Sequence, residues 1–338
     1  MTDAPRAIQE PREISRIAYG FMASKALFAA LNLDLFGRLA NGPRSLDELV
    51  RETTIAPSRL RKLLTVCVSL GLLETRDGGR YANAPASQSY LVRSAPAYFG
   101  DYYRFQIDRQ IYPRFEHLDA ALRGDGRGFY GLMEDPTEAE YFSRAQHSGS
   151  LGPAHVTAKL VDLSGCRRLL DVGGGTGAFS IALCRRYREL TAAILDFPNV
   201  GPVAERYVRE SGLEARIAFL PGNALEVPWP DGQDVVLMSY LVSAVAEKRV
   251  DQLLDRARRA LVPGGQLLLH DFMVEDDGGG PLSAALWLLS SVIIDPDSVT
   301  LTPGWLSGQV AARGLVVEHV RDVIPGITRL LLARRPRD

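Results

Sequence analysis

The feature that most constrains the fold of this chain is a short apolar strand that runs directly into a glycine-rich turn, at Leu169-Leu-Asp-Val-Gly-Gly-Gly-Thr-Gly-Ala-Phe-Ser180. An amphipathic helix follows and continues to Tyr187. The glycines at 173, 175 and 177 let the backbone approach a ligand closely, and the start of the helix directs free N–H groups toward that ligand. The segment therefore predicts an α/β sheet that binds a nucleotide-like ligand at the carboxyl end of this strand.

The identity of the ligand depends on the acidic residues near the turn. The spacing Gly173-x-Gly175-x-x-Ala178 also fits the fingerprint of dinucleotide-binding folds. Asp171, however, lies at the end of the strand, where a carboxylate would repel a pyrophosphate but could hold a cationic amine. The next strand ends in Asp196, near the place about 20 residues on where an acid usually holds ribose hydroxyls. The two acids favour S-adenosylmethionine (SAM), which has an amino acid tail and a ribose but no phosphate. A glycine turn without a ligand is the alternative.

Composition excludes several classes of protein. The chain has 338 residues, enough for two domains, and a formal net charge of −1, which indicates no polyanionic partner overall. Cys67, Cys166 and Cys184 are far apart, which indicates a reducing compartment rather than a structural zinc. The amino-terminal residues carry both signs of charge, unlike a signal peptide, and no apolar run approaches the roughly 18 residues needed to cross a bilayer. We expect a cytoplasmic protein without a membrane partner.

Strands and helices alternate after the glycine turn at the spacing of an α/β fold. Five strands are expected at Arg168–Val172, Ala192–Asp196, Arg216–Leu220, Asp234–Ser239 and Gln266–Asp271. The last predicted helix of this series, Lys248–Leu261, is stopped by Val262-Pro-Gly-Gly265. Two further strands, Leu315–Val320 and Thr328–Arg334, are joined by a turn at Pro325-Gly326 and predict an antiparallel hairpin. Seven strands with this ending favour a methyltransferase sheet over a six-stranded dinucleotide fold.

The amino-terminal part of the chain is different, because helices dominate it. A long apolar-rich helix is expected at Ile14–Leu31, with Ile17, Ala18, Phe21 and Met22 on one face. Three short helices are expected at Leu35–Leu39, Ser45–Glu52 and Pro57–Leu70. Two short strands, Leu72–Thr75 and Arg80–Ala82, would form a β-wing. This order predicts a winged helix.

A winged helix raises the alternative of a DNA-binding regulator. The third short helix carries Arg59, Arg61 and Lys62, which could contact phosphates. Acidic residues nearby dilute any basic patch, namely Asp47, Glu48, Glu52 and Glu74. We therefore expect no nucleic-acid partner.

Taken together, a winged helix followed by this sheet resembles the small-molecule O-methyltransferase family, which includes plant caffeate-type enzymes and bacterial enzymes of antibiotic and pigment pathways. The resemblance runs from about Arg12 to Arg335. It implies an α/β fold with the seven-stranded, Rossmann-like sheet of class I methyltransferases. It also implies a winged-helix dimerisation domain at 1–97, a helical linker and substrate-pocket segment at 98–164, and a SAM-binding catalytic domain at 165–338. Family members are usually homodimers.

The resemblance also assigns cofactor contacts. Asp171, Gly173 and Gly175 match the motif that holds the methionine part of SAM. Asp196 matches the ribose-binding acid, and Phe197 follows it where an apolar residue stacks on adenine. The next contacts expected are Asn223, Ala224 and Ser239, with the amide oxygen of Asn223 bonded to the adenine amine.

The sequence departs from the family after the fourth strand. Plant-type members read approximately Leu-Lys-x-x-Leu-His-Asp-Trp there, and the histidine deprotonates the acceptor hydroxyl. Here the segment is Leu237-Met-Ser-Tyr-Leu-Val-Ser-Ala244, which places Val242 on the histidine position. Valine cannot take a proton, so the usual general base is absent. Three explanations are open. The acceptor loses its proton without a base on the enzyme, or another residue serves as the base. Alternatively, the protein binds SAM for chemistry other than methylation.

Three residues are candidates for the missing chemistry. His270 ends the fifth strand, at the edge where sites form, although its side chain could face either side of the sheet. His147 lies in a helix whose family counterpart lines the substrate pocket. Tyr240 could orient an acceptor through its hydroxyl. No His, Cys and acid cluster has metal-ligand spacing, so we expect metal-independent chemistry.

The acceptor pocket is expected to involve Phe142, Gln146 and Trp287, the last on an apolar helix at Pro281–Ile294. Few polar groups in such a pocket suit a flat, largely apolar acceptor. The sequence therefore predicts a homodimeric, SAM-dependent methyltransferase of bacterial specialised metabolism, acting on oxygen or carbon of a small molecule.

Overall fold

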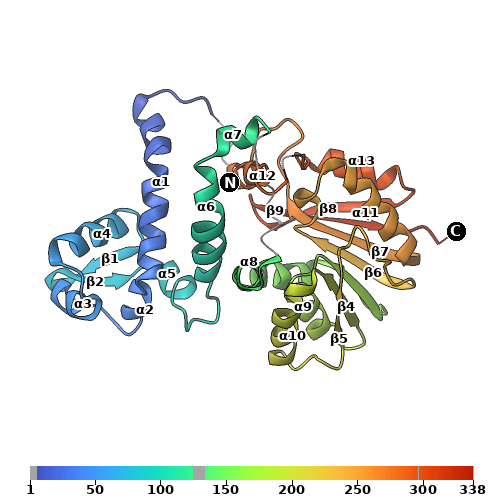
Figure 1. The fold of residues 1–338 in the computed structure, drawn as a ribbon, viewed down its shortest axis with the longest axis horizontal. Coiled ribbons are helices and arrows are strands. Elements are labelled where there is room, and N and C mark those ends of the chain that lie inside the picture. The colour runs from blue at the N-terminus through green and yellow to red at the C-terminus, as the bar shows by residue number, and fades with distance from the viewer. Residues whose placement is uncertain (1–5, 125–133, 296, 338) are drawn as a thin grey trace. The chain divides into compact units, whose positions relative to one another are not determined.

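A computed structural model of the chain describes residues 6–124, 134–295 and 297–337. It contains two compact units, one at Arg6–Tyr112 and one from Pro113 onward (Figure 1). No helix among the described residues is both long and apolar enough to cross a membrane.

The amino-terminal unit is a winged helix, as predicted. It begins with the long helix α1 (Pro11–Asn32) and the short helices α2 (Leu35–Arg38), α3 (Leu46–Thr53) and α4 (Pro57–Ser69). Strands β1 (Leu73–Arg76) and β2 (Arg80–Asn83) form the antiparallel wing. Helix α5 (Pro85–Tyr90) and a π-helix, η2 (Tyr102–Ile111), complete the unit. A small core holds the elements together through Leu31, Leu35, Phe36, Leu49, Leu60, Leu64 and Leu73.

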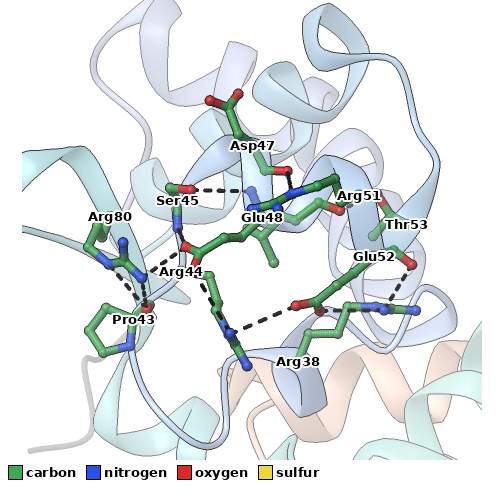
Figure 2. Close-up of polar contacts among 11 residues, drawn as sticks. Arg38, Pro43, Arg44, Ser45, Asp47, Glu48, Arg51, Glu52, Thr53 and Arg80 are labelled. Atoms are coloured by element: carbon green, nitrogen blue, oxygen red, sulfur yellow. Dashed lines mark hydrogen bonds and ion pairs between the residues drawn. The ribbon is translucent and has the colours of Figure 1, made fainter.

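Charged residues tie the wing to helix α3 (Figure 2). Ser45 caps the helix by accepting a hydrogen bond from the Glu48 N–H, and Glu48 accepts one in return from the Ser45 N–H. The guanidinium of Arg80, on β2, donates to the same Glu48 carboxylate at 2.9 Å. These donors hold the pKa of Glu48 at about 2, the backbone N–H of Ser45 contributing most. The acid at this position is therefore paired within its own unit.

One face of α1 is apolar and exposed to solvent in the single chain. Ile14, Ile17, Phe21 and Met22 lie on it, and Ile17 keeps 70% of its surface exposed. The buried side chains of this helix are confined to its carboxyl-terminal end, at Phe28, Ala30 and Leu31. A row of exposed apolar residues of this kind is typical of a surface that binds another molecule.

The second unit contains a seven-stranded sheet. It is preceded by α6 (Tyr112–Phe115), α7 (Leu118–Leu122) and α8 (Pro136–Leu160). The strands are β3 (Arg168–Val172), β4 (Thr191–Asp196), β5 (Ile217–Pro221), β6 (Gln233–Ser239), β7 (Leu261–Phe272), β8 (Val316–Ile324) and β9 (Thr328–Arg334). Their order in the sheet is β5-β4-β3-β6-β7-β9-β8. All neighbours are parallel except for the β9 pairings, because β8 and β9 form the predicted hairpin.

The start of β7 differs from the prediction. Val262-Pro-Gly-Gly265 was expected to end a helix, and helix α11 (Glu247–Ala260) does end just before it. The strand nevertheless begins at Leu261, which pairs with Gln233, whereas the next pair along the two strands is Val235 with Gln266. The proline and glycines are therefore accommodated in an irregularity of the strand, where an unpaired residue is tolerated.

Helices cover both faces of the sheet (Figure 1). Side chains alternate along each strand, so Leu169 packs with α8, α9 (Ala178–Arg186) and α10 (Gly201–Glu210), whereas Leu170 packs with α11 and its neighbours. The neighbours of α11 on that face are α12 (Leu282–Ser291) and α13 (Pro303–Ala311). The carboxyl ends of the parallel strands β3, β4 and β6 lie at one edge of this three-layer arrangement, which is where ligands bind in open α/β sheets.

Candidate active site

A cavity of about 480 Å³ opens at the carboxyl edge of the sheet. The ends of β3, β4 and β6 form its floor, and helix α8 contributes Phe142, Ser143, Gln146 and Ser150. All eight residues expected to contact SAM line it, namely Asp171, Gly173, Gly175, Asp196, Phe197, Asn223, Ala224 and Ser239. Residues that are far apart in the sequence are therefore brought together as the glycine-turn motif predicts.

The two carboxylate oxygens of Asp171 differ in their hydrogen bonding. Ser180, on α9, donates its hydroxyl to Oδ2 at 2.6 Å, while Oδ1 is buried and has no hydrogen-bond partner among the described residues. Burial raises the pKa of Asp171 to about 6, and the negative charge of Asp196 acts in the same direction. A buried acceptor without a partner costs about 1–3 kcal/mol, which a ligand with a charged N–H donor would relieve. The α-ammonium group of SAM fits this requirement.

The glycine turn brings the backbone around Asp171 without side chains. A Cβ on Gly174 would lie 2.6 Å from Cγ of Asp171, so no other residue fits there. Gly175 has φ +54°, and its Cβ direction is open space. Its N–H donates to Oδ2 of Asp196 at 2.7 Å. The turn therefore links the two acids of the site directly.

Asp196 is fixed by two backbone donors. Besides the Gly175 N–H, the Phe197 N–H donates to Oδ1 at 2.7 Å. Burial raises the pKa of Asp196, and these two hydrogen bonds oppose that rise. Each carboxylate oxygen keeps further acceptor capacity, which fits the two hydroxyls of a ribose.

Asn223 makes two side-chain hydrogen bonds in the loop after β5. Its Oδ1 accepts from the Leu225 N–H and its Nδ2 donates to Glu226, both at 3.0 Å. The side chain thus stabilises the turn that follows β5, because an Asn oxygen readily bonds a backbone N–H two residues on. The adjacent Ala224 carbonyl accepts from the indole N–H of Trp229 at 2.9 Å.

Neither His147 nor His270, the two histidines considered as replacement bases, is among the residues that line the cavity. Nδ1 of His147 lies 2.8 Å from Oγ1 of Thr176, and its ring stacks on Tyr207 with centroids 3.6 Å apart. His270 is fully buried between strands, 2.9 Å from both Ser239 and Thr328. Burial lowers the pKa of His147 to about 4 and that of His270 to about 3. Both imidazoles are therefore neutral and bonded to hydroxyls near neutral pH.

Tyr240 does line the cavity, in an unusual backbone conformation. Its φ is +57°, which for a bulky residue costs on the order of 1–3 kcal/mol and is retained where the surroundings enforce it. Its N–H donates to the His270 carbonyl at 2.8 Å, and its ring packs edge-on against His270. Strain of this kind is concentrated at functional sites, which favours a role for Tyr240 there.

The segment that departs from the plant-type pattern forms part of the core. Val242 is 1% exposed, in a short 3-10 turn, η5 (Val242–Ala244). Ser243 donates its N–H and hydroxyl to Asp271, at 3.0 and 2.6 Å. Burial raises the pKa of Asp271 to about 6, although the Ser243 donors act against it.

The residues expected in the acceptor pocket separate into two groups. Phe142 and Gln146 line the cavity, whereas Trp287 stacks on Phe272 at 4.8 Å and is not part of its wall. Four further residues line the cavity without having been predicted from the sequence, namely Thr176, Leu241, Lys248 and Arg249. Thr176 and Leu241 adjoin assigned motifs and could have been found from that position. The part of the chain that the structure describes holds no group of three His, Cys, Asp or Glu residues suited to a metal ion.

Comparison with known proteins agrees with this geometry. Residues 119–297 match the O-methyltransferase domain, and residues 15–93 match the O-methyltransferase dimerisation domain. The chain is 32% identical over 295 residues to 3-hydroxy-5-methyl-1-naphthoate 3-O-methyltransferase of Streptomyces sahachiroi, covering 86% of this chain and 85% of that protein. It is also 32% identical to the N,N-dimethyltransferase OxyT of Streptomyces rimosus, covering 81% and 82% of the two chains.

The fold is shared with solved structures over nearly the whole chain. Human N-acetylserotonin methyltransferase in complex with SAM superposes with a TM-score of 0.85 at 26% identity, covering 98% of this chain and all of that one. The site residues and the fold lead to the same conclusion: the chain belongs to the O-methyltransferase family and is a SAM-dependent methyltransferase.

Proposed function

We propose that this protein methylates a hydroxyl group on a flat, aromatic small molecule of bacterial specialised metabolism, without a histidine general base. The proposal rests on Val242, which is buried in the core and which the resemblance to plant-type members places at the position of their histidine. The relative from Streptomyces sahachiroi, which acts on a hydroxynaphthoate, supports an aromatic hydroxyl as the acceptor.

The residues of the site divide the work of holding SAM. Asp171 would bind the α-ammonium group through Oδ1, and the turn at Gly173 and Gly175 would face the rest of the amino acid tail. Asp196 would bind the ribose hydroxyls. The adenine would lie among Phe197, Asn223 and Ala224, with Ser239 at the floor. When bound, SAM supplies a methyl group on a sulfonium, which an acceptor takes by in-line displacement.

Positioning would provide most of the acceleration. Phe142 and Gln146 from α8 and Tyr240 from the end of β6 lie on the same cavity and would orient the acceptor. Holding two reactants in line can contribute about 7–11 kcal/mol to lowering a barrier. Without a base, the acceptor oxygen must lose its proton to solvent before it attacks. The proposal therefore favours acidic hydroxyls, such as a phenol with a carbonyl group para to it, whose anion is partly populated near neutral pH.

The experiment is to incubate the enzyme with SAM and paired hydroxynaphthoates, one with an acidic phenol and one with an ordinary phenol. Mass spectrometry and NMR of the products would identify the methylated atom. We expect methylation at oxygen, faster for the acidic phenol at pH 7. Methylation at carbon or nitrogen, or a preference for the less acidic phenol, would contradict the proposal.

We also infer that the protein acts as a homodimer. The exposed apolar face of α1, formed by Ile14, Ile17, Phe21 and Met22, lies in the unit that matches the dimerisation domain. Burying this face in a second copy would remove apolar surface from water. Light scattering after size exclusion should give a mass of two chains, and Ile17→Glu with Phe21→Glu should shift it to one.

A further inference from the structure

His147 makes a contact that neither the cofactor residues nor the acceptor residues explain. It lies on α8, and its Nδ1 is 2.8 Å from Oγ1 of Thr176, in the middle of the glycine turn. Thr176 is almost fully buried, at 3% exposure. The two residues are 29 positions apart in the sequence, so the contact joins the helix before the sheet to the loop that holds the cofactor.

The imidazole is itself held firmly. Its ring stacks on Tyr207 of α10, with an angle of 13° between the planes. Stacking of two rings limits the rotation of the imidazole about its side-chain bonds, which lowers the entropy lost when the hydrogen bond forms. The imidazole is therefore attached to α8, stacked on a residue of α10 and hydrogen-bonded to Thr176.

The residues on either side of Thr176 connect it to the residues that we assign to SAM binding. Gly175, immediately before it, donates its N–H to Asp196. Gly177, immediately after it, donates to the Gly174 carbonyl at 2.8 Å and is the N-cap residue of α9. A displacement of Thr176 would therefore shift the Gly175 N–H and the Asp196 carboxylate together.

We propose that His147 is a positioning residue for the cofactor, which fixes the glycine turn through the Thr176 hydroxyl rather than exchanging a proton with the acceptor. The inference rests on the proposed roles of Asp171 and Asp196 in binding SAM. Loss of the contact weakens SAM binding without changing the rate of methyl transfer at saturating SAM.

The test compares substitutions that distinguish the effect of ring stacking from the effect of the hydrogen bond made by Nδ1. His147→Phe keeps an aromatic ring on Tyr207 and removes the hydrogen bond, so SAM affinity should fall about two- to ten-fold, the range for one hydrogen bond, with kcat unchanged. Thr176→Val should give the same loss, and the double variant should lose no more than either single variant. His147→Asn, whose amide can take the place of Nδ1, should recover part of the affinity. His117→Phe, on the exposed His117 before α7, is the matched control and should bind SAM as the wild type does.

Three results would overturn the proposal. A fall in kcat at unchanged SAM affinity in His147→Phe would place His147 in the chemical step. Additive losses in the double variant would mean that the two side chains act separately. Wild-type SAM affinity in His147→Phe would mean that the contact between His147 and Thr176 does not contribute to SAM binding. Asp196→Ala, measured in parallel, tests the cofactor assignment on its own, because unchanged SAM affinity there would remove the proposed function instead.

Discussion

Ser180 donates its hydroxyl hydrogen to Oδ2 of Asp171 over 2.6 Å, and the other oxygen of that buried carboxylate has no protein partner among the described residues. One oxygen of Asp171 is therefore fixed by the helix that follows the glycine turn, whereas the other is available to a ligand. The cost of this arrangement appears in the raised pKa of Asp171, about 6.

Replacing Asp171 with Asn should stabilise the ligand-free protein and abolish SAM binding. The folded-state pKa is raised from 3.8 to about 6, so the contribution of this group to stability is lost as pH rises from 3.8 through 6. At pH 7.5 the buried charge then costs about 3 kcal/mol. Asp171→Asn should raise the melting temperature at pH 7.5 and have little effect at pH 4. A lower melting temperature at pH 7.5 would contradict the assignment of a buried, costly charge.

SAM affinity should fall as pH drops below about 6, because Asp171 must be charged to bind an ammonium group. Ser180→Ala should move the midpoint of this fall to higher pH, because the hydroxyl donates to the charged form and its loss disfavours ionisation. Calorimetric titrations from pH 5 to 8 measure both midpoints. Ser211→Ala, which removes a hydroxyl bonded to the Val208 carbonyl, is the control and should leave the midpoint unchanged. A midpoint that moves to lower pH in Ser180→Ala would be inconsistent with this account.

Arg256 should control cofactor affinity from outside the cavity. Its guanidinium donates to the carbonyls of Ala224, Leu225 and Val227, in the loop that we assign to adenine. Five donors in a fixed planar fork make this possible, and Lys cannot reproduce it. Arg256→Lys should raise the KM for SAM several-fold and leave kcat close to the wild type. Arg259→Lys, on the same helix, should change neither constant, and an equal effect of both substitutions would rule out the specific role of Arg256.

Much of the fold could be predicted because its signals are local. The strand, glycine turn and helix around Asp171 lie within a dozen residues, and the hairpin of β8 and β9 is announced by Pro325-Gly326. The two acids that we assign to the cofactor were found from the same pattern, since each lies at or next to the end of a parallel strand at one edge of the sheet.

The roles of the histidines could not be predicted, because they depend on partners far away in the sequence. His270 lies in a central strand whose neighbours are β6 and β9, so its two ring nitrogens meet Ser239 and Thr328, 31 and 58 residues away. His147 is fixed by Thr176 and Tyr207, which come from two other elements. Asn223 is a different case, because its contact with the Leu225 N–H is local, and its Oδ1 keeps a second lone pair for the expected bond to adenine.

The measurement that tests the central claim most directly is the pH dependence of kcat/KM for two acceptors whose hydroxyl pKa values differ by two units or more, at saturating SAM. If the acceptor reacts as a preformed anion, kcat/KM should rise with pH, and its inflection should move with the pKa of the acceptor. An inflection that stays at one pH for both acceptors would reveal a general base on the enzyme and contradict the account.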